Sequence, residues 1–342
     1  MALGKTDKNN RADLRQFFLE HHGWGDREPT FLAGDASNRT YYRVTSSRGH
    51  TAVLMDAHEP TEKVHEFIQI DKLLHTMGYS VPEILAHDYE NRLILLEDLG
   101  DETFTYCLEK GIPPDELYKS ATEVIIDLHK NYKHGPSINI PFYNLEVYRR
   151  ECDTLIDWYY PSIFGKTISP QAQKEWGEIW DTILTKELLL SKTLVLRDFH
   201  VDNLLWLKKR DTLQRCGLLD FQDALIGSPA YDLVSLFEDA RQDVDPVMTQ
   251  NLLNFYASHF PDLDTDQFMK EYYILGAQRS AKILGFFTRL AIRDKKTRYL
   301  EFIPRTWKWL EQDLKHPALD KIKNWMDVYI PAEKRKVPDV TN

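Results

Sequence analysis

Three polar side chains in the second half of the chain have the types and spacing that phosphoryl transfer requires. Asp198 lies five residues before Asn203, and Asp220 follows Asn203 by 17 residues. One carboxylate can orient and deprotonate an attacking hydroxyl, while an amide oxygen and a second carboxylate can hold Mg²⁺ against the phosphates of a nucleotide. Taken singly, Asp198 and Asp220 are more often turn or capping residues. Their joint spacing favours catalysis, with Asp198 as the base and Asn203 and Asp220 as metal ligands.

The elements that position these residues change in kind near residue 100. Before it, the sequence predicts short strands at 41–45, 51–55 and 92–97, together with one helix whose apolar residues follow helical spacing from Val64 onward. Gly78 stands where a C-terminal glycine would end that helix. This half of the chain is therefore predicted to be a small sheet with one helix.

After residue 100, helical periodicity dominates, and helices are also expected over 265–293 and 300–327. Three short β-like runs interrupt it at 193–196, 203–207 and 216–219. We expect an α+β, two-lobed fold, with residues 1–99 as a nucleotide-binding lobe and residues 100–342 as a catalytic and substrate-binding lobe. A mostly β lobe joined to a mostly α lobe usually binds its ligand between them.

Composition excludes several other classes of protein. The 342 residues carry a formal net charge of −10, which makes binding to a nucleic-acid backbone an unlikely role. The cysteines, Cys107, Cys152 and Cys216, are few and widely spaced, so neither a disulfide framework nor a zinc site is expected. The N-terminus lacks an apolar leader and no window reaches about 18 apolar residues, so a cytoplasmic protein with no membrane partner is the simplest expectation.

The order of motifs resembles the protein-kinase-like fold, and more closely its aminoglycoside phosphotransferase and choline kinase branch. The catalytic loop of that branch has the approximate pattern H-G-D-x-H-x-x-N, and Asp198, His200 and Asn203 match it. It continues with I-D-F/W, matched at 219–221, and with G-D-P-A-x-D-L, matched at 227–233. Three motifs in the same order and spacing make this resemblance specific, whereas a lone D-x-x-x-x-N would carry no weight.

The resemblance implies a kinase that uses ATP and Mg²⁺, with Asp198 as base. It also implies that Asp232 braces the catalytic loop, and that His200 fixes the loop by hydrogen bonding rather than by transferring a proton. Two interpretations stay open for Asp202, a solvated loop carboxylate or a substrate contact. His200 and Asp202 are therefore both candidates for the substrate site.

The same resemblance assigns nucleotide contacts to the first 100 residues. A turn before the strand at 41–45 would cover the phosphates with backbone N–H groups and small side chains. Its residues are Gly34, Asp35, Ala36, Ser37, Asn38 and Arg39. At the junction between the lobes, backbone groups of Glu97 and Leu99 are the candidates for binding adenine.

One expected residue is missing. Kinases of this fold carry a lysine or arginine on the third strand, but residues 51–56 contain no base. We expect Arg39 or Arg43, on the preceding turn and strand, to supply the charge. Glu66, on the following helix, is the candidate for the usual ion-pair partner or for a solvated side chain.

Further segments are similar to a subgroup, the anomeric N-acetylmuramate/N-acetylglucosamine kinases of cell-wall recycling. These are V-L-M-D-A at 53–57, L-L-E-D-L-G-D at 95–101 and L-R-D-F-H-V-D-N-L at 196–204. The resemblance implies that the acceptor is the anomeric hydroxyl of an N-acetyl amino sugar. N-acetylmuramate carries a lactyl carboxylate, which a guanidinium or ammonium would bind.

Candidates for the sugar site lie on two predicted helices. Arg279 and Lys282 could meet the lactyl carboxylate, although a solvated helix face explains them equally well. Glu151 and Trp158 could line the sugar, with Trp158 stacked on the ring, or could be ordinary residues of an amphipathic helix.

Two rival functions remain. A kinase for a cationic acceptor, such as an aminoglycoside or choline, would have a site rich in carboxylates. A catalytically dead kinase fold that only binds nucleotide is favoured by the missing lysine, and disfavoured by the joint presence of Asp198, Asn203 and Asp220.

Overall fold

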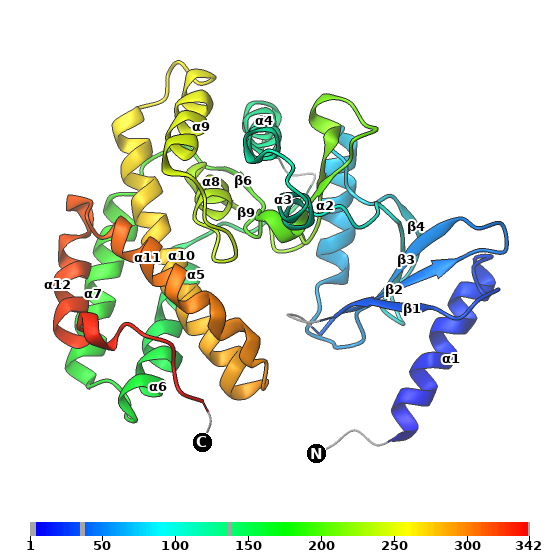
Figure 1. Cartoon of the computed structure of the whole chain (residues 1–342), viewed down its shortest axis with the longest axis horizontal. Helices are drawn as coiled ribbons and strands as arrows, with labels where there is room; N and C mark the ends of the chain where they lie inside the picture. Colours follow the sequence, from blue (N-terminus) through cyan, green and yellow to red (C-terminus); the bar gives the residue numbers. More distant parts are fainter. Residues whose placement is uncertain (1–4, 35–37, 136–137, 341–342) are drawn as a thin grey trace. The chain divides into compact units, whose positions relative to one another are not determined.

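The computed structural model describes residues 5–34, 38–135 and 138–340, and the chain forms two compact units (Figure 1). Unit 1 consists of Met1–Cys107 and Asn203–Asp223, and unit 2 of Leu108–Asp202 and Ala224–Asn342. Unit 1 thus includes a segment from far along the chain. The division into a nucleotide-binding lobe of residues 1–99 and a catalytic lobe of residues 100–342 stays a prediction.

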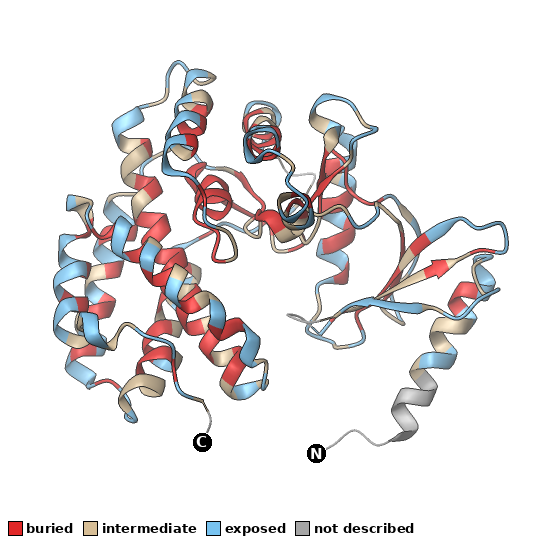
Figure 2. Cartoon of the chain, in the orientation of Figure 1, coloured by how far each residue is buried: buried red, intermediate tan, exposed pale blue. Residues whose placement is uncertain are grey.

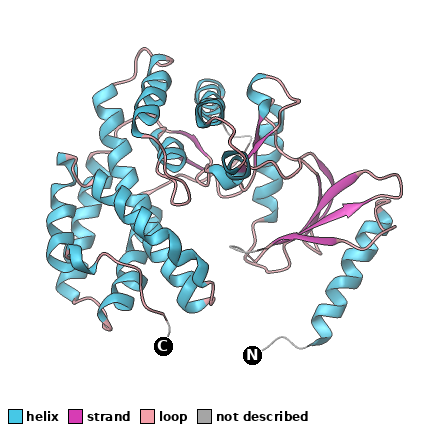
Figure 3. Ribbon diagram, viewed as in Figure 1, coloured by secondary structure: helices cyan, strands magenta, loops and turns pink. Residues whose placement is uncertain are grey.

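Unit 1 is built on a five-stranded antiparallel sheet with the strand order β1-β2-β3-β5-β4 (Figure 3). The strands are β1 (Thr30–Ala33), β2 (Thr40–Thr45), β3 (Thr51–Asp56), β4 (Ile84–Asp88) and β5 (Leu93–Glu97). In strands β3 and β5 most side chains are buried. The strands expected at 41–45, 51–55 and 92–97 are confirmed.

Helices and a hairpin complete the described part of unit 1. Helix α1 (Lys5–His21) packs through Phe18 and Leu19 on a core formed with Val44, Leu54 and Leu95. Helix α2 (Val64–Thr76) ends where Gly78 takes a positive φ of 89°, as expected from the sequence. The hairpin pairs β7 (Leu204–Trp206) with β8 (Cys216–Leu218), the 3₁₀ turn η3 (Thr212–Arg215) lies before β8, and the short helix α3 (Phe104–Glu109) follows the sheet.

Unit 2 is mostly helical. Its helices are α4 (Pro114–Asn131), α5 (Leu145–Thr154), α6 (Tyr160–Phe164), α7 (Pro170–Lys186), α8 (Ala230–Phe237), α9 (Pro246–Ser258), α10 (Thr265–Arg293), α11 (Ile303–Asp313) and α12 (Asp320–Tyr329). Strands β6 (Thr193–Val195) and β9 (Leu225–Gly227) form a small antiparallel pair. Short turns are η2 (Val201–Asn203), η4 (Thr297–Phe302), η5 (Pro317–Leu319) and η6 (Ala332–Lys334). Buried residues run along much of α10, which makes it the central helix of this unit (Figure 2).

Helices α5 and α10 touch at one very close point. A Cβ on Gly285 would lie 2.1 Å from the carbonyl carbon of Thr154, so only glycine fits there. The Thr154 hydroxyl donates to the carbonyl oxygens of Glu151, at 2.7 Å, and Lys282, at 3.1 Å. Immediately afterwards the helix changes to a π turn, η1 (Leu155–Tyr159), a form that often marks functional sites.

Two carboxyl groups are buried together beside α10. Glu238 and Asp313 are 7% and 0% exposed, and a Cβ on Gly276 would lie within 2.6 Å of an oxygen of each. Burial raises the pKa of Glu238 to about 7, and burial together with the nearby Glu238 raises that of Asp313 well above its usual range. The pair therefore holds at least one proton at neutral pH and is protonated at acidic pH.

The expected α+β fold, with a β-rich N-terminal unit and a helical one after it, is confirmed. The segment 300–327 is not one helix, because it breaks at 314–319 between α11 and α12. Across the described ranges, no helix has the length and apolarity needed to span a membrane. All three cysteines are buried and free.

Candidate active site

The loop that carries Asp198 runs from the end of β6 to the start of β7. Its backbone is tightly turned, since the amide of Asp198 donates to the carbonyl of Leu196 at 2.9 Å and the amide of His200 donates to that of Asp198 at 3.2 Å. Arg197 has a φ of 71°, in the left-handed region. These turns set the direction of the side chain that follows.

Asp232, in the first turn of α8, fixes the backbone just before Asp198. Its carboxylate accepts hydrogen bonds from the amides of Leu196, at 2.7 Å, and Arg197, at 2.8 Å. It is fully buried, and burial raises its pKa to about 7 although the two amides act in the opposite direction. Ser235, on the same helix, donates to the carbonyl of Arg197 at 3.2 Å. Helix α8 thus holds the loop from one side.

A second support, which the sequence did not reveal, follows α8. Asp239 accepts a hydrogen bond from the amide of Val201 at 3.3 Å, and Arg241 pairs with Asp202 at 2.6 Å. Asp202 is thus a partly exposed loop carboxylate held by an arginine. Buried His200 has a pKa well below its usual range, because of burial and the charges of Arg241 and Arg279, so its imidazole is neutral.

The hairpin brings Asn203 and Asp220 to the same end of β7 and β8. The amide of Leu219 donates to the carbonyl of Asn203 at 2.9 Å, continuing the register in which Leu204 faces Leu218. Asp220 follows directly, with a φ of 60°. The next residue, Phe221, stacks on Phe67 of α2 with ring centroids 5.1 Å apart. A carboxylate and an amide are therefore held next to each other on an anchored turn.

Arg39 contacts this turn. Its guanidinium is 2.7 Å from an oxygen of Asp220 and 3.2 Å from Glu62, and its side chain is 8% exposed. Glu62 also accepts a hydrogen bond from the amide of Asn38 at 3.1 Å. The expected Glu66 partner is exposed on α2 instead, so the acidic partner is Glu62, four residues earlier.

Arg43 lies elsewhere on the sheet. It pairs with Asp98 and Asp101, each at 2.8 Å. These two carboxylates follow β5, at the far end of β2 from Arg39. Of the two arginines, Arg39 is the one that the structure brings to Asp220.

The structure describes only some of the residues expected to bind the phosphates, and it describes both of those expected to bind adenine. Gly34 and Asn38 flank the turn, while Asp35, Ala36 and Ser37 lie outside the described residues. The Glu97 side chain pairs with Arg210 at 2.6 Å, and its amide donates to the carbonyl of Glu83 at 2.8 Å. For Glu97 the backbone carbonyl is therefore the group to consider for adenine, together with the amide of Leu99.

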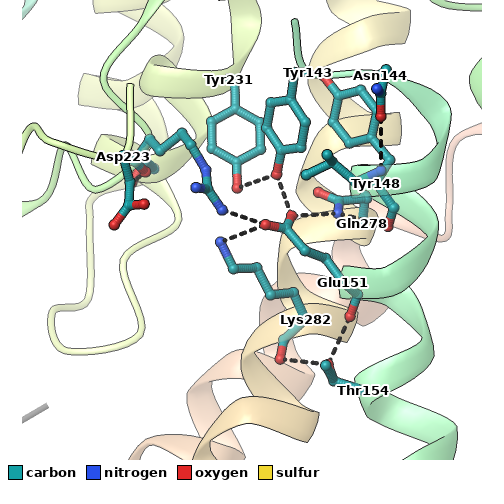
Figure 4. Close-up of polar contacts among 12 residues, drawn as sticks. Tyr143, Asn144, Tyr148, Glu151, Thr154, Asp223, Tyr231, Gln278 and Lys282 are labelled. Atoms are coloured by element: carbon teal, nitrogen blue, oxygen red, sulfur yellow. Dashed lines mark hydrogen bonds and ion pairs between the residues drawn. The ribbon is translucent and has the colours of Figure 1, made fainter. Parts of the chain in front are cut away.

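On unit 2, Glu151 of α5 gathers a polar cluster next to the catalytic loop (Figure 4). It accepts from the Arg197 guanidinium and the Tyr143 hydroxyl, and from Gln278 at 3.1 Å. The ammonium of Lys282 lies 3.3 Å from it. Burial acts in the opposite direction, but the charges of Lys282 and Arg197 lower the pKa of Glu151, so it is ionised.

The other two acceptor candidates, Arg279 and Trp158, lie on α10 and on the π turn η1. Buried Arg279 donates to the carbonyl of Glu238 at 3.4 Å. Trp158 is half-buried on the π turn η1. Sequence reasoning had named Glu151 and Lys282 but had missed Arg197, Tyr143 and Gln278. The departure from H-G-D at residue 197 was the available signal for Arg197.

A shallow groove of about 480 Å³ lies between α7 and α12, with Glu175, Lys321 and Trp325 among its lining residues. None of the candidate residues described above lines it. The groove is therefore separate from the candidate catalytic residues.

The chain is similar in sequence to known phosphotransferases. Residues 28–272 match the model of the phosphotransferase enzyme family. Two relatives named N-acetylmuramate/N-acetylglucosamine kinase are each 33% identical to the chain. The one from Caulobacter vibrioides covers 97% of this chain and 100% of its own length, and the one from Pseudomonas aeruginosa 84% and 85%.

Solved structures show the same fold at much lower identity. A choline/ethanolamine kinase family protein from Mesorhizobium loti has a TM-score of 0.61 at 14% identity, covering 93% of this chain and 99% of its own. The amicoumacin kinase hAmiN, in complex with AMP-PNP, Ca²⁺ and Ami, has a TM-score of 0.60 at 16% identity, covering 92% and 97%.

Proposed function

Because this chain belongs to the phosphotransferase enzyme family, we propose that it transfers the γ-phosphoryl group of ATP to the anomeric hydroxyl of N-acetylmuramate or N-acetylglucosamine. The observation that carries the choice of acceptor is the 33% identity, over 97% of the chain, to a relative with that name. A cytoplasmic location, where ATP is available, is part of the proposal.

Asp198 is the proposed base. In the reaction the acceptor oxygen bonds to the γ-phosphorus and the bond from phosphorus to the bridging oxygen breaks, so that ADP leaves with the electron pair. The hydroxyl proton passes to the Asp198 carboxylate. Asp232 holds the backbone just before this residue at 2.7 and 2.8 Å, which fixes the orientation that proton transfer requires.

Asn203 and Asp220 are the proposed ligands of Mg²⁺. The donor set fits, because one carboxylate and one amide oxygen on adjacent positions of a hairpin leave the remaining sites to water and phosphate oxygens, as Mg²⁺ prefers. Bound there, Mg²⁺ would neutralise charge on the nucleotide phosphates. The hairpin contact between Leu219 and Asn203 keeps the two ligands together.

Arg39 is the proposed replacement for the missing strand lysine. It is buried, it is always charged, and its pairing with Glu62 has the same chemistry as the lysine–glutamate pair of kinases. The turn from Gly34 to Asn38, including Asp35, Ala36 and Ser37, would lie over the phosphates. The carbonyl of Glu97 and the amide of Leu99 would bind adenine.

The charges at Glu151 favour a neutral or anionic acceptor over a cationic one. Two cations, Arg197 and Lys282, share this carboxylate, whereas an aminoglycoside or choline site would be rich in carboxylates. His200, Asp202, Trp158 and Arg279 remain candidates for further acceptor contacts.

A coupled assay of ADP release with Mg²⁺ tests the proposal. The panel contains N-acetylmuramate, N-acetylglucosamine, other hexoses, choline and kanamycin, and we expect turnover on the two N-acetyl sugars. Asp198→Asn should reduce kcat by about 10²- to 10⁴-fold, the usual contribution of a positioned general base. Wild-type-like turnover in this variant would remove the mechanism. Nucleotide binding with no turnover on any acceptor would favour a dead kinase fold.

A further inference from the structure

The residue before the proposed base has a backbone conformation that its type disfavours. Arg197 has a φ of 71°, where a Cβ is crowded, and the H-G-D pattern that the loop resembles has glycine at this position. A non-glycine residue held in the left-handed region often has a functional reason. The contacts of the Arg197 side chain indicate such a reason.

The Arg197 side chain reaches the acceptor-side cluster. Its guanidinium pairs with Glu151 and lies over the Tyr143 ring, 5.4 Å from the centroid, and the side chain is 13% exposed. Because Asp232 clamps the Arg197 amide, the backbone cannot turn this guanidinium away. Arg197 is therefore a fixed partner of Glu151.

Glu151 has several donors, so it does not depend on any one of them (Figure 4). Arg197 is an ionic partner, and Tyr143 and Gln278 are hydrogen-bonding partners. If Lys282 turned to another anion, Glu151 would remain neutralised and hydrogen-bonded. A buried carboxylate without other partners would destabilise the fold when Lys282 moved away from it.

Lys282 is the more accessible of the two cations. Its side chain is 21% exposed, against 13% for Arg197, and it ends 3.3 Å from Glu151. An ammonium has three N–H donors, so it can bind a second carboxylate while it stays near the first. Burial acts against its charge, but Glu151 and, more weakly, Asp198 raise the pKa of Lys282, so it is charged. Its partner Glu151 also pairs with Arg197 of the catalytic loop, so the ammonium lies beside that loop.

We propose that Lys282 determines acceptor specificity by binding a carboxylate of the acceptor, such as the lactyl group of N-acetylmuramate. This inference rests on the proposed sugar kinase function. Glu151 and Arg197 are positioning residues in this scheme. They hold the ammonium in place beside the catalytic loop.

The test compares kcat/KM for N-acetylmuramate and N-acetylglucosamine at saturating ATP and Mg²⁺. In Lys282→Met we expect kcat/KM for N-acetylmuramate, divided by kcat/KM for N-acetylglucosamine, to fall about 10- to 100-fold. The fall should come mainly from a higher KM for N-acetylmuramate, as for the loss of a charge-assisted hydrogen bond. Lys282→Arg should restore part of the ratio. Arg293→Met, on an exposed side chain of the same helix paired with Asp294, is the matched control and should leave the ratio unchanged.

An equal loss on both sugars would overturn the inference, because it would mean that Lys282 serves Asp198 or the fold. An unchanged ratio would overturn it as well. If Lys282→Met fails to fold, the wild type is tested with N-acetylmuramate whose lactyl carboxylate has been converted to the amide. A fall of tenfold or more supports the inference, and equal kcat/KM rejects it. Absence of wild-type turnover on either sugar would instead refute the proposed function.

Discussion

Replacing Arg39 by alanine should weaken the use of ATP without touching the acceptor site. Arg39 is 8% exposed on its side chain and lies 2.7 Å from Asp220, the proposed metal ligand. Two unit charges about 4 Å apart interact by about 4 kcal/mol at an effective dielectric constant of about 20. Since Arg39 already pairs with Asp220 and Glu62, part of that energy is exchanged rather than gained when phosphates bind. We therefore expect a loss of about 2 to 3 kcal/mol, which lowers kcat/KM for ATP about 30- to 150-fold.

The structure offers a matched control and a second readout. Arg43→Ala removes a nearby arginine that pairs with Asp98 and Asp101 instead, and it should change kcat/KM for ATP by less than about threefold, because its partners are not the proposed metal ligand. Arg39→Ala should also bind free Mn²⁺ more tightly than the wild type, because it removes a positive charge beside Asp220.

The assay is steady-state ADP release with ATP varied at saturating N-acetylglucosamine, and Mn²⁺ affinity is measured by titration without nucleotide. Thermal melting establishes that each variant is folded at the assay temperature. Arg39→Lys should give intermediate activity, since an ammonium keeps the charge but not the fork of donors. If Arg39→Ala matched the wild type, or if Arg43→Ala lost as much, the assignment of Arg39 would be refuted.

Two further predictions concern buried charges in unit 2. Glu151→Gln should lower the free energy of unfolding by about 3 kcal/mol, because it leaves the cations Arg197 and Lys282 without their shared carboxylate; urea titration measures this, and an unchanged midpoint would contradict it. Raised carboxyl pKa values mean that the folded state holds more protons than the unfolded state between about pH 4 and pH 7, so the stability that Glu238 contributes is present at acidic pH and is lost as pH rises through about 7. Glu238→Gln should therefore stabilise the protein more at pH 8 than at pH 5, by about 2 kcal/mol, whereas an equal effect at both pH values would show that Glu238 does not titrate in this range.

The arrangement of the catalytic candidates was predictable because it is local. Asp198, Asn203 and Asp220 lie on one loop and the hairpin that follows, so their spacing along the chain carries most of the information. Asp232 was predictable through its motif. The short β-like runs and the glycine-terminated helix before Gly78 predicted elements of unit 1 for the same reason.

The ion-pair partners were not predictable, because they depend on tertiary packing. Arg39 and Arg43 are both odd-numbered positions near one strand, and alternation along a strand gives them the same face. Only the register, with Arg43 opposite Val53 and Val53 opposite Leu96, places Arg43 beside the acidic residues after β5. Glu62 lies before α2, outside any helical pattern.

Arg197 shows a further limit. Its replacement of the usual glycine was visible in the sequence, but its partner Glu151 lies 46 residues earlier on another helix. Neither the left-handed backbone nor the shared carboxylate could be inferred from spacing. Both follow from how α8 holds the loop and how α5 lies beside α10.

The contact between Thr154 and Gly285 has a practical consequence for altering the acceptor. Because a side chain at residue 285 would collide with the α5 backbone, the separation of the two helices is set there and not by the polar residues near the loop. A mutant library that keeps these two residues and randomises Lys282 should therefore change recognition while it preserves the scaffold. A library that includes residue 285 should mostly yield misfolded protein.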